Sequence, residues 1–368
     1  MRCVALLALI ACGHSEPAPA PIRFLHTFSP DETELFNAIM VEQGIAVEAK
    51  LAPFARGQQV IGEMLRAGTN CPDLMRIDAT WLPGLAPQLA PAPKGDDWLP
   101  EAAASDVAMP QTIDGLVVVR DAAAPAPATP SVHDLVAAAR AAKHEERKFP
   151  LGLRVDGYWF LPWLRAHGGE LQPGAAGLGE TGDTRATQAL GEFGALFGDV
   201  AAPPPPSGEE APDELRRWAS HDDAYWVTGP WQIGALKDRE RLVVSSLAGA
   251  PRGGQLLVVP KCARDPAAGW RLAGVLTSVA VSKRFAEAFA TVPTHKAALA
   301  ASPALVQQIY ASLQPAQPLP RSPMTPLLFD DLNPALAAVV SGDATAEEAI
   351  AGVRRGWERL TRERKHER

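Results

Sequence analysis

Positive charge, cysteine and metal-binding spacings are all scarce in this sequence. Its 368 residues carry 35 Lys and Arg against 42 Asp and Glu, which gives a formal net charge of −7. Because a protein that binds a phosphate backbone needs a basic surface, we predict no nucleic-acid partner. The four Cys and eight His show no spacing typical of a metal site, and we predict no bound metal.

The sequence also lacks the short motifs of common enzyme classes. It contains no Walker loop, no Gly-x-Ser-x-Gly elbow and no Rossmann glycine fingerprint. His144 stands in a charge run without the second His of a zincin helix, which indicates solvated surface. We therefore predict no catalytic residue, no cofactor and no enzymatic activity. A secreted hydrolase that uses paired carboxylates stays open as an alternative, because their separation is a three-dimensional quantity.

Proline is abundant instead, with 35 residues, roughly twice the usual share of about 5%. The apolar stretch 3–11 is too short for a membrane-spanning helix, which needs about 20 residues, and suits a signal-peptide core. Leu9-Ile10-Ala11-Cys12 resembles the bacterial lipobox. We predict a signal peptide over 1–11, lipidation of Cys12 and a Pro/Ala tether over 12–21, with a plain secretory signal as the alternative.

Cys71 and Cys262 would be the only thiols of such an exported chain. An oxidising compartment would allow them to form a disulfide. The sequence does not show that their Cα atoms approach to about 6 Å, so their pairing stays open.

Helix and strand patterns alternate along the chain. Ser29, Pro30 and Glu32 form a capping box that predicts a helix over 30–43, and Thr345 with Glu348 predicts a C-terminal helix. Strands are expected at 22–25, 46–51, 73–78, 115–119 and 256–259, and further helices at 58–67, 131–143, 183–197 and 265–276. This order predicts an α/β fold with parallel pairing among the first strands.

Tryptophan is over-represented among the aromatics, with nine Trp against three Tyr. Several Trp stand in polar or Gly/Pro-containing stretches where turns are expected. Ligands of α/β folds bind beyond the carboxyl ends of strands, and a flat indole matches the apolar face of a sugar ring. One stacked ring contributes on the order of 1 kcal/mol from apolar area. Core packing is the alternative for each single Trp.

Several short pieces stand in the order found in a known family. They are 22–28 with the capped helix after it, 67–68, 72–78 followed by Trp81, 156–159 with 167–169, 228–231, 253–254, 265–276, 292–299, and 341–342 before the Thr345 helix. With them the sequence resembles the extracellular solute-binding proteins of ABC importers (family 1), in the group that includes maltose-binding protein. Gly229-Pro230-Trp231 is the most specific piece.

The resemblance implies a two-lobed α/β periplasmic-binding-protein fold of type II, with a helix-flanked sheet in each lobe and a hinge between them. Residues 22–115 and 260–313 would form the first lobe, and 116–259 and 314–368 the second. The chain would cross between lobes near 115–119, 256–260 and 313–320.

The resemblance also implies a carbohydrate ligand that a monomeric receptor at the cell envelope delivers to the transmembrane subunits of an ABC importer. With the lipobox-like sequence, we expect this receptor to be lipid-anchored. The expected ligand-binding residues are Asp78, Trp81, Tyr158, Trp159, Trp231, Phe329 and Glu32, with Asp31 and Asp156 as further partners for hydroxyls. Residues 118–121 depart from the aromatic-Asn pattern of many family members. A receptor-like scaffold that has lost ligand binding is therefore a third hypothesis.

Overall fold

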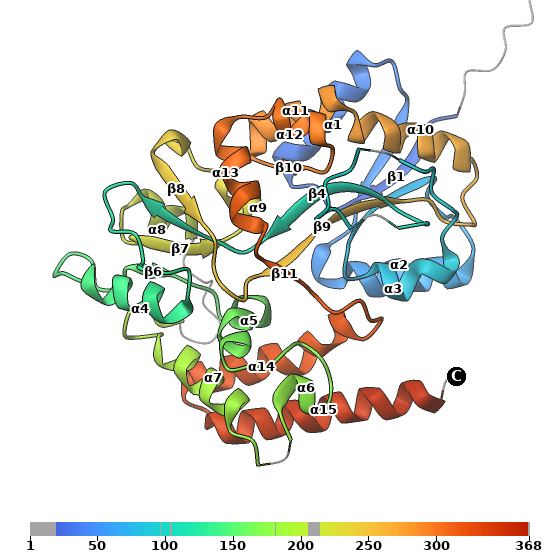
Figure 1. Cartoon of the computed structure of the whole chain (residues 1–368). Coiled ribbons are helices and arrows are strands. Elements are labelled where there is room, and N and C mark those ends of the chain that lie inside the picture. The colour runs from blue at the N-terminus through green and yellow to red at the C-terminus, as the bar shows by residue number, and fades with distance from the viewer. Residues whose placement is uncertain (1–19, 96, 104, 181, 205–213, 367–368) are drawn as a thin grey trace, which may run out of the picture.

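Two β-sheets flanked by helices form the framework of the protein (Figure 1). This computed structural model describes residues 20–366 apart from 96, 104, 181 and 205–213. The predicted signal peptide, the lipidation site Cys12 and most of the predicted tether lie outside these residues. The two sheets confirm the predicted α/β class. Within the part of the chain that is described, none of the helices is both long and apolar enough to cross a membrane.

The larger sheet has seven strands in the order β10-β4-β9-β3-β1-β2, with β11 beside β9. They are β1 (Ile22–His26), β2 (Val47–Leu51), β3 (Leu74–Asp78), β4 (Met109–Gly115), β9 (Pro251–Val258), β10 (Val292–Pro293) and β11 (Gln317–Pro318). Strand β1 pairs in parallel with β2 and β3, as predicted. Strand β9 runs antiparallel between β3 and β4.

Helices cover both faces of the larger sheet (Figure 1). One face packs on α1 (Pro30–Glu42), α10 (Pro266–Thr277) and α11 (Val279–Phe289), and the other on α2 (Phe54–Ala67) and α3 (Leu82–Leu85). Strand residues alternate between the two faces, so Leu74 and Leu257 contact the first group while Met75 and Leu256 contact the second.

The smaller sheet has the order β6-β7-β5-β8. Its strands are β5 (Val117–Asp121), β6 (Leu151–Gly152), β7 (Tyr225–Thr228) and β8 (Leu242–Ser245). The cluster of buried side chains on one face of this sheet extends through α4 (Val132–Ala141), α5 (Gly157–Ala166), α7 (Arg185–Ala195), α14 (Leu328–Ser341) and α15 (Ala346–His366). The remaining α-helices of the described residues are α6 (Ala175–Leu178), α8 (Glu214–Ala219), α9 (Pro230–Ile233), α12 (Lys296–Ala300) and α13 (Ala304–Leu313).

Both predicted capping boxes are present. The Ser29 hydroxyl accepts from the Glu32 N–H at 3.2 Å, and the Glu32 carboxylate accepts from the Ser29 N–H at 2.8 Å. Thr345 and Glu348 make the same reciprocal bonds at 3.2 and 2.9 Å. Because these contacts satisfy donors that a helix start leaves open, α1 and α15 begin where the sequence predicts.

The second crossing between the sheets lies earlier than the sequence predicts. We assigned 116–259 to the second lobe, but β9 pairs with β3 and β4 of the larger sheet. A central strand is buried on both faces, so its sequence is a continuous apolar run. Such a run does not indicate to which of the two sheets the strand belongs. The chain therefore returns between Ser245 and Pro251. The other predicted boundaries stay a prediction.

A hydrophobic cluster joins the two sheets beside this crossing. Val119 of β5 and Val244 of β8 pack with Ile309 and Leu313 of α13. The Ser312 hydroxyl, which donates to the Gln308 carbonyl at 2.9 Å, also lies 3.3 Å from the Val244 carbonyl. Helix α13, which we assigned to the first lobe, therefore contacts the smaller sheet.

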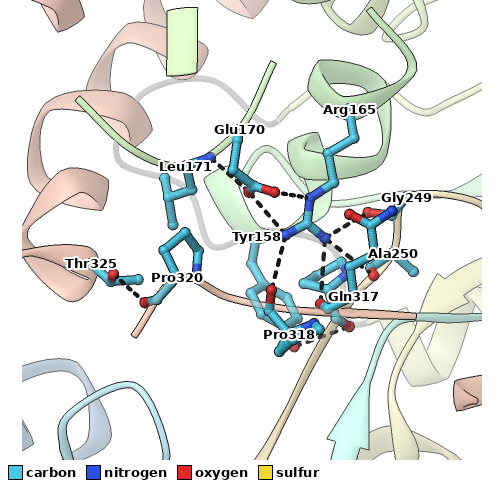
Figure 2. Close-up of polar contacts among 11 residues, drawn as sticks. Tyr158, Arg165, Glu170, Leu171, Gly249, Ala250, Gln317, Pro318, Pro320 and Thr325 are labelled. Atoms are coloured by element: carbon cyan, nitrogen blue, oxygen red, sulfur yellow. Dashed lines mark hydrogen bonds and ion pairs between the residues drawn. The ribbon is translucent and has the colours of Figure 1, made fainter. Parts of the chain in front are cut away.

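Arg165 of α5 connects the helices of the smaller sheet to two of the crossings (Figure 2). Its guanidinium donates to the carbonyls of Gly249 and Ala250 at 3.0 and 3.3 Å, and approaches two carbonyls of β11 at 3.5 Å. Glu170 accepts two further hydrogen bonds from it, at 3.0 and 2.9 Å. The Arg165 side chain is 5% exposed, so protein groups rather than water satisfy its charge.

A disulfide joins Cys71 to Cys262, the pairing that the sequence leaves open. Their Cα atoms lie 5.8 Å apart. Cys71 precedes β3 and Cys262 follows β9, and these strands are neighbours in the larger sheet. The bridge therefore lies at one sheet and does not connect the two.

Candidate functional site

Two carboxylates of the larger sheet lie close to the start of α5. Asp78 ends β3 and Asp114 lies near the end of β4, with β9 between these strands. A Cβ on Gly253 of β9 would lie 3.1 Å from Asp114 Oδ1 and 3.8 Å from the Tyr158 hydroxyl. Gln255 of β9 donates to Asp78 at 3.4 Å. Polar groups of the larger sheet therefore meet a tyrosine carried by a helix of the smaller one.

Burial changes the protonation of these groups. Burial raises the pKa of Asp114 to about 7, and the charge of Asp78 adds to this effect. Burial also raises the pKa of Asp78, although hydrogen bonds from Thr80 oppose the rise. The pKa of Tyr158 is raised well above its ordinary value by burial and by both carboxylates. Near neutral pH the pair therefore offers a hydrogen-bond donor as well as acceptors.

Asp114→Asn is expected to flatten the pH dependence of stability. The pKa of Asp114 is raised from 3.8 to about 7. Between these two pH values, the folded state therefore holds a proton on Asp114 that the unfolded state has lost. The contribution of protonated Asp114 to the free energy of unfolding is complete below the unfolded-state pKa, and it is lost as the pH rises through about 7. Over this pH range, titration of Asp114 should lower the free energy of unfolding of the wild type by up to about 1.4 kcal/mol per pH unit. Asp114→Asn should not show this decrease.

Chemical denaturation between about pH 4 and pH 8 measures the difference. Asp31→Asn is the control, because Asp31 is exposed on the first turn of α1. Equal slopes in the wild type and Asp114→Asn would contradict the assignment.

Arg76 is a buried cation beside the two carboxylates, and it is 7% exposed. It donates to Gln111 and to Thr27, both at 2.7 Å, and its guanidinium carbon lies 4.6 Å from the centre of the Phe28 ring. Burial lowers its pKa, whereas nearby carboxylates, among them Asp114, raise it. Sequence analysis did not select Arg76 as a site residue, although it stands in the matched piece 72–78.

Three aromatic rings gather at the start of α5. The Trp231 ring centre lies 6.5 Å from that of Tyr158 and 6.1 Å from that of Trp159. Trp159 is 6% exposed and donates its indole N–H to the Val227 carbonyl at 2.7 Å. Trp231 is 44% exposed, so Trp159 supports the cluster while Trp231 offers a ring surface to solvent.

Asp156 and α14 fix the position of Tyr158. Asp156 caps α5 by accepting from the Tyr158 N–H at 2.7 Å, and Asn333 accepts from the Gly157 N–H at 2.7 Å. Phe329 packs so closely that a Cβ on Gly157 would lie 2.7 Å from its ring. Burial raises the pKa of Asp156. Phe329 and Asp156 therefore share one end of α5 with Tyr158.

Trp81 and Glu32, two of the predicted ligand-binding residues, make structural contacts away from the aromatic cluster. Trp81 is 4% exposed, and a Cβ on Gly57 would lie 2.4 Å from its ring. The exposed aromatic at this corner is Phe54, at 57% exposure and 5.2 Å from Trp81 between ring centres, and sequence analysis missed it. Glu32 gives one carboxylate oxygen to the α1 cap and lines a small cavity beside Arg76.

No protein-family model and no curated protein matches the chain in sequence, but solved structures match its fold. The GacH receptor of Streptomyces glaucescens, solved unliganded and with acarbose, has a TM-score of 0.78 at 23% identity, covering 92% of this chain and 98% of that one. Maltose-bound MalE3 of T. maritima has a TM-score of 0.79 at 20% identity, covering 92% and 99%.

A third match is an ABC transporter solute-binding protein of Thermotoga lettingae bound with α-D-tagatose. Its TM-score is 0.75 at 21% identity, covering 92% of this chain and 99% of that one. The chain has the two-lobed fold of these solute-binding proteins. We refer to the larger sheet with its helices as the first lobe and to the smaller sheet with its helices as the second lobe. The predicted fold class is thereby confirmed, and the matched structures are binding proteins rather than enzymes.

Proposed function

We propose that the protein is a carbohydrate receptor that closes on its ligand between two lobes. The exposed Trp231, supported by Tyr158 and Trp159 in the second lobe, carries this proposal. An open indole covers the apolar face of a sugar ring, and nearby polar groups fix its orientation. Asp78 and Asp114 of the first lobe supply acceptors and, near neutral pH, a donor.

Of the other predicted residues, some border the ligand in this proposal and some position its neighbours. Phe329 and Asp156 border the ligand beside Tyr158, because they share its end of α5. Trp159 and Trp81 are both buried, so we propose that they hold the neighbouring exposed rings of Trp231 and Phe54 in place. Glu32 acts through Arg76, whose charge it faces. Matched structures with acarbose, maltose and tagatose support a carbohydrate as the ligand class.

We propose further that the receptor is an exported monomer, anchored through a lipid on Cys12, that passes its ligand to the transmembrane subunits of an ABC importer. The Cys71–Cys262 disulfide supports export, because such bonds persist in oxidising compartments. The apolar stretch 3–11 and the lipobox-like sequence before Cys12 support the anchor. Mass spectrometry of the membrane fraction should find acyl chains on Cys12, and an unmodified Cys12 would contradict the anchor.

Titration with a panel of mono- and oligosaccharides tests the proposed ligand class. Trp fluorescence should change saturably with at least one sugar, and the melting temperature should rise. Ligand at 100 times its Kd stabilises the folded state by about 2.7 kcal/mol. A response to amino acids or peptides, with none to any sugar, would overturn the carbohydrate assignment.

The adjacent carboxylates favour one alternative, a glycoside hydrolase that uses Asp78 and Asp114 as its pair. A raised carboxyl pKa next to a second carboxylate is the arrangement of an acid and its partner. Incubation with chromogenic glycosides separates the two functions. Turnover that Asp114→Asn abolishes would favour the hydrolase, whereas saturable binding without turnover favours the receptor.

A further inference from the structure

Three metal-ligating side chains meet on the surface of the second lobe. His133 lies in the first turn of α4, His167 follows the last residue of α5, and Glu192 lies on α7. The Nε2 atom of His167 lies 3.0 Å from Glu192 Oε2, and that of His133 lies 3.5 Å from the same oxygen. One ligand atom from each residue lies within 4.8 Å of the others.

These distances suit a single ion bound by all three residues. Zinc takes imidazole nitrogen and carboxylate oxygen at about 2.0 to 2.2 Å, usually in a tetrahedron, so neighbouring ligand atoms lie about 3.4 Å apart. The observed 3.0 and 3.5 Å fall on either side of this value. Two His and one Glu are an established zinc ligand set that leaves the fourth position to water.

We propose that His133, His167 and Glu192 bind a divalent transition-metal ion, with Zn²⁺ as the ion that their chemistry fits best. Imidazole favours zinc, copper and nickel over calcium and magnesium, which prefer oxygen ligands alone. The side chains are 65%, 17% and 45% exposed for His133, His167 and Glu192, so an ion reaches them directly from solvent.

The surroundings of the cluster carry charges of both signs, and the first turn of α4 at His133 is a helix end with partial positive charge. His167 lies at the carboxyl end of α5, where the helix carries partial negative charge. Arg185 comes near through its hydrogen bond to the Gly168 carbonyl at 3.3 Å, but Asp183 pairs with it at 2.7 Å. The positive charge of Arg185 is therefore largely offset.

The ion would join three helices without entering the proposed carbohydrate site. Helix α5 carries His167 at its carboxyl end and Tyr158 at its amino end. Without a metal, both His contact the same carboxylate oxygen of Glu192, and such partly exposed polar contacts contribute at most about 1 kcal/mol. With a metal, α4, α5 and α7 are cross-linked. The inference stands whether or not the protein binds sugar.

Isothermal titration of the full-length protein with ZnCl₂, after dialysis against EDTA and without a histidine tag, tests the proposal. We expect one ion per chain near pH 7.5 and at least about tenfold weaker binding for His167→Ala and for Glu192→Gln. CaCl₂ and MgCl₂ should give no comparable heat.

His144→Ala is the matched control, because His144 is an exposed histidine outside the cluster. Its zinc affinity should equal that of the wild type, and circular dichroism should show that every variant is folded. Zinc binding that survives both His167→Ala and Glu192→Gln unchanged would overturn the site. So would the absence of binding to the wild type by Zn²⁺, Ni²⁺ and Cu²⁺.

Discussion

Trp231→Ala is expected to weaken carbohydrate binding by about 10- to 100-fold, which corresponds to about 1.4 to 2.7 kcal/mol. The expected loss is large because the open indole is the surface on which we propose that the sugar ring stacks. The free energy of unfolding should change by less than about 1 kcal/mol, because the Trp231 ring is 44% exposed and contributes little to the core. Titration with the sugar that binds the wild type measures the affinity, and urea denaturation measures the stability.

Trp159→Ala is the matched comparison for stability, because it removes the same side chain from a neighbouring buried position. Trp159 is 6% exposed, donates to the Val227 carbonyl and lies 4.9 Å from the Arg154 guanidinium. This change should cost about 3 to 5 kcal/mol of stability. Trp231→Phe should keep part of the affinity, since it retains a flat ring. Full affinity in Trp231→Ala would show that this ring is not the stacking surface.

Replacing Cys71 and Cys262 by Ser is expected to cost about 4 to 5 kcal/mol of stability. The bridge closes a loop with a sequence separation of 191 residues, and long loops lose the most entropy in the unfolded state when they are closed. Urea denaturation of the wild type and the double variant measures the change. Reductant should bring the wild type down to the stability of the variant and leave the variant unaltered. Equal stabilities without reductant would argue against the bridge.

Features set by contacts within one turn of helix were predictable from the sequence. Ser29 with Glu32 and Thr345 with Glu348 bond across three residues, so each pair is visible as a spacing. The parallel pairing of β1, β2 and β3 was also predictable, because strands that alternate with helices pair in this way.

Features set by remote neighbours were not predictable. The apolar run of β9 fits the centre of either sheet, and its partners β3 and β4 lie more than a hundred residues away in sequence. The chemistry of Asp114 likewise depends on Asp78 from another strand. His133, His167 and Glu192 come from three different helices, so no local spacing revealed them.

The aromatic residues of the site were only partly predictable. Tyr158, Trp159 and Trp231, which the matched motifs contain, lie next to one another in the structure, at a capped helix start and a Gly-Pro turn. The sequence did not show which ring is open to solvent. That property depends on packing, as the exposed Phe54 beside the buried Trp81 illustrates.

The contacts of Arg165 limit where the backbone can change direction if the two lobes close as we propose. This side chain of the second lobe holds the carbonyls of Gly249 and Ala250, so we expect that stretch to move together with α5. The residues that follow belong to the larger sheet, because β9 pairs with β11 from Pro251 and with β4 from Arg252. In this crossing, we therefore expect lobe closure to change the backbone only in the short stretch that joins Ala250 to Pro251.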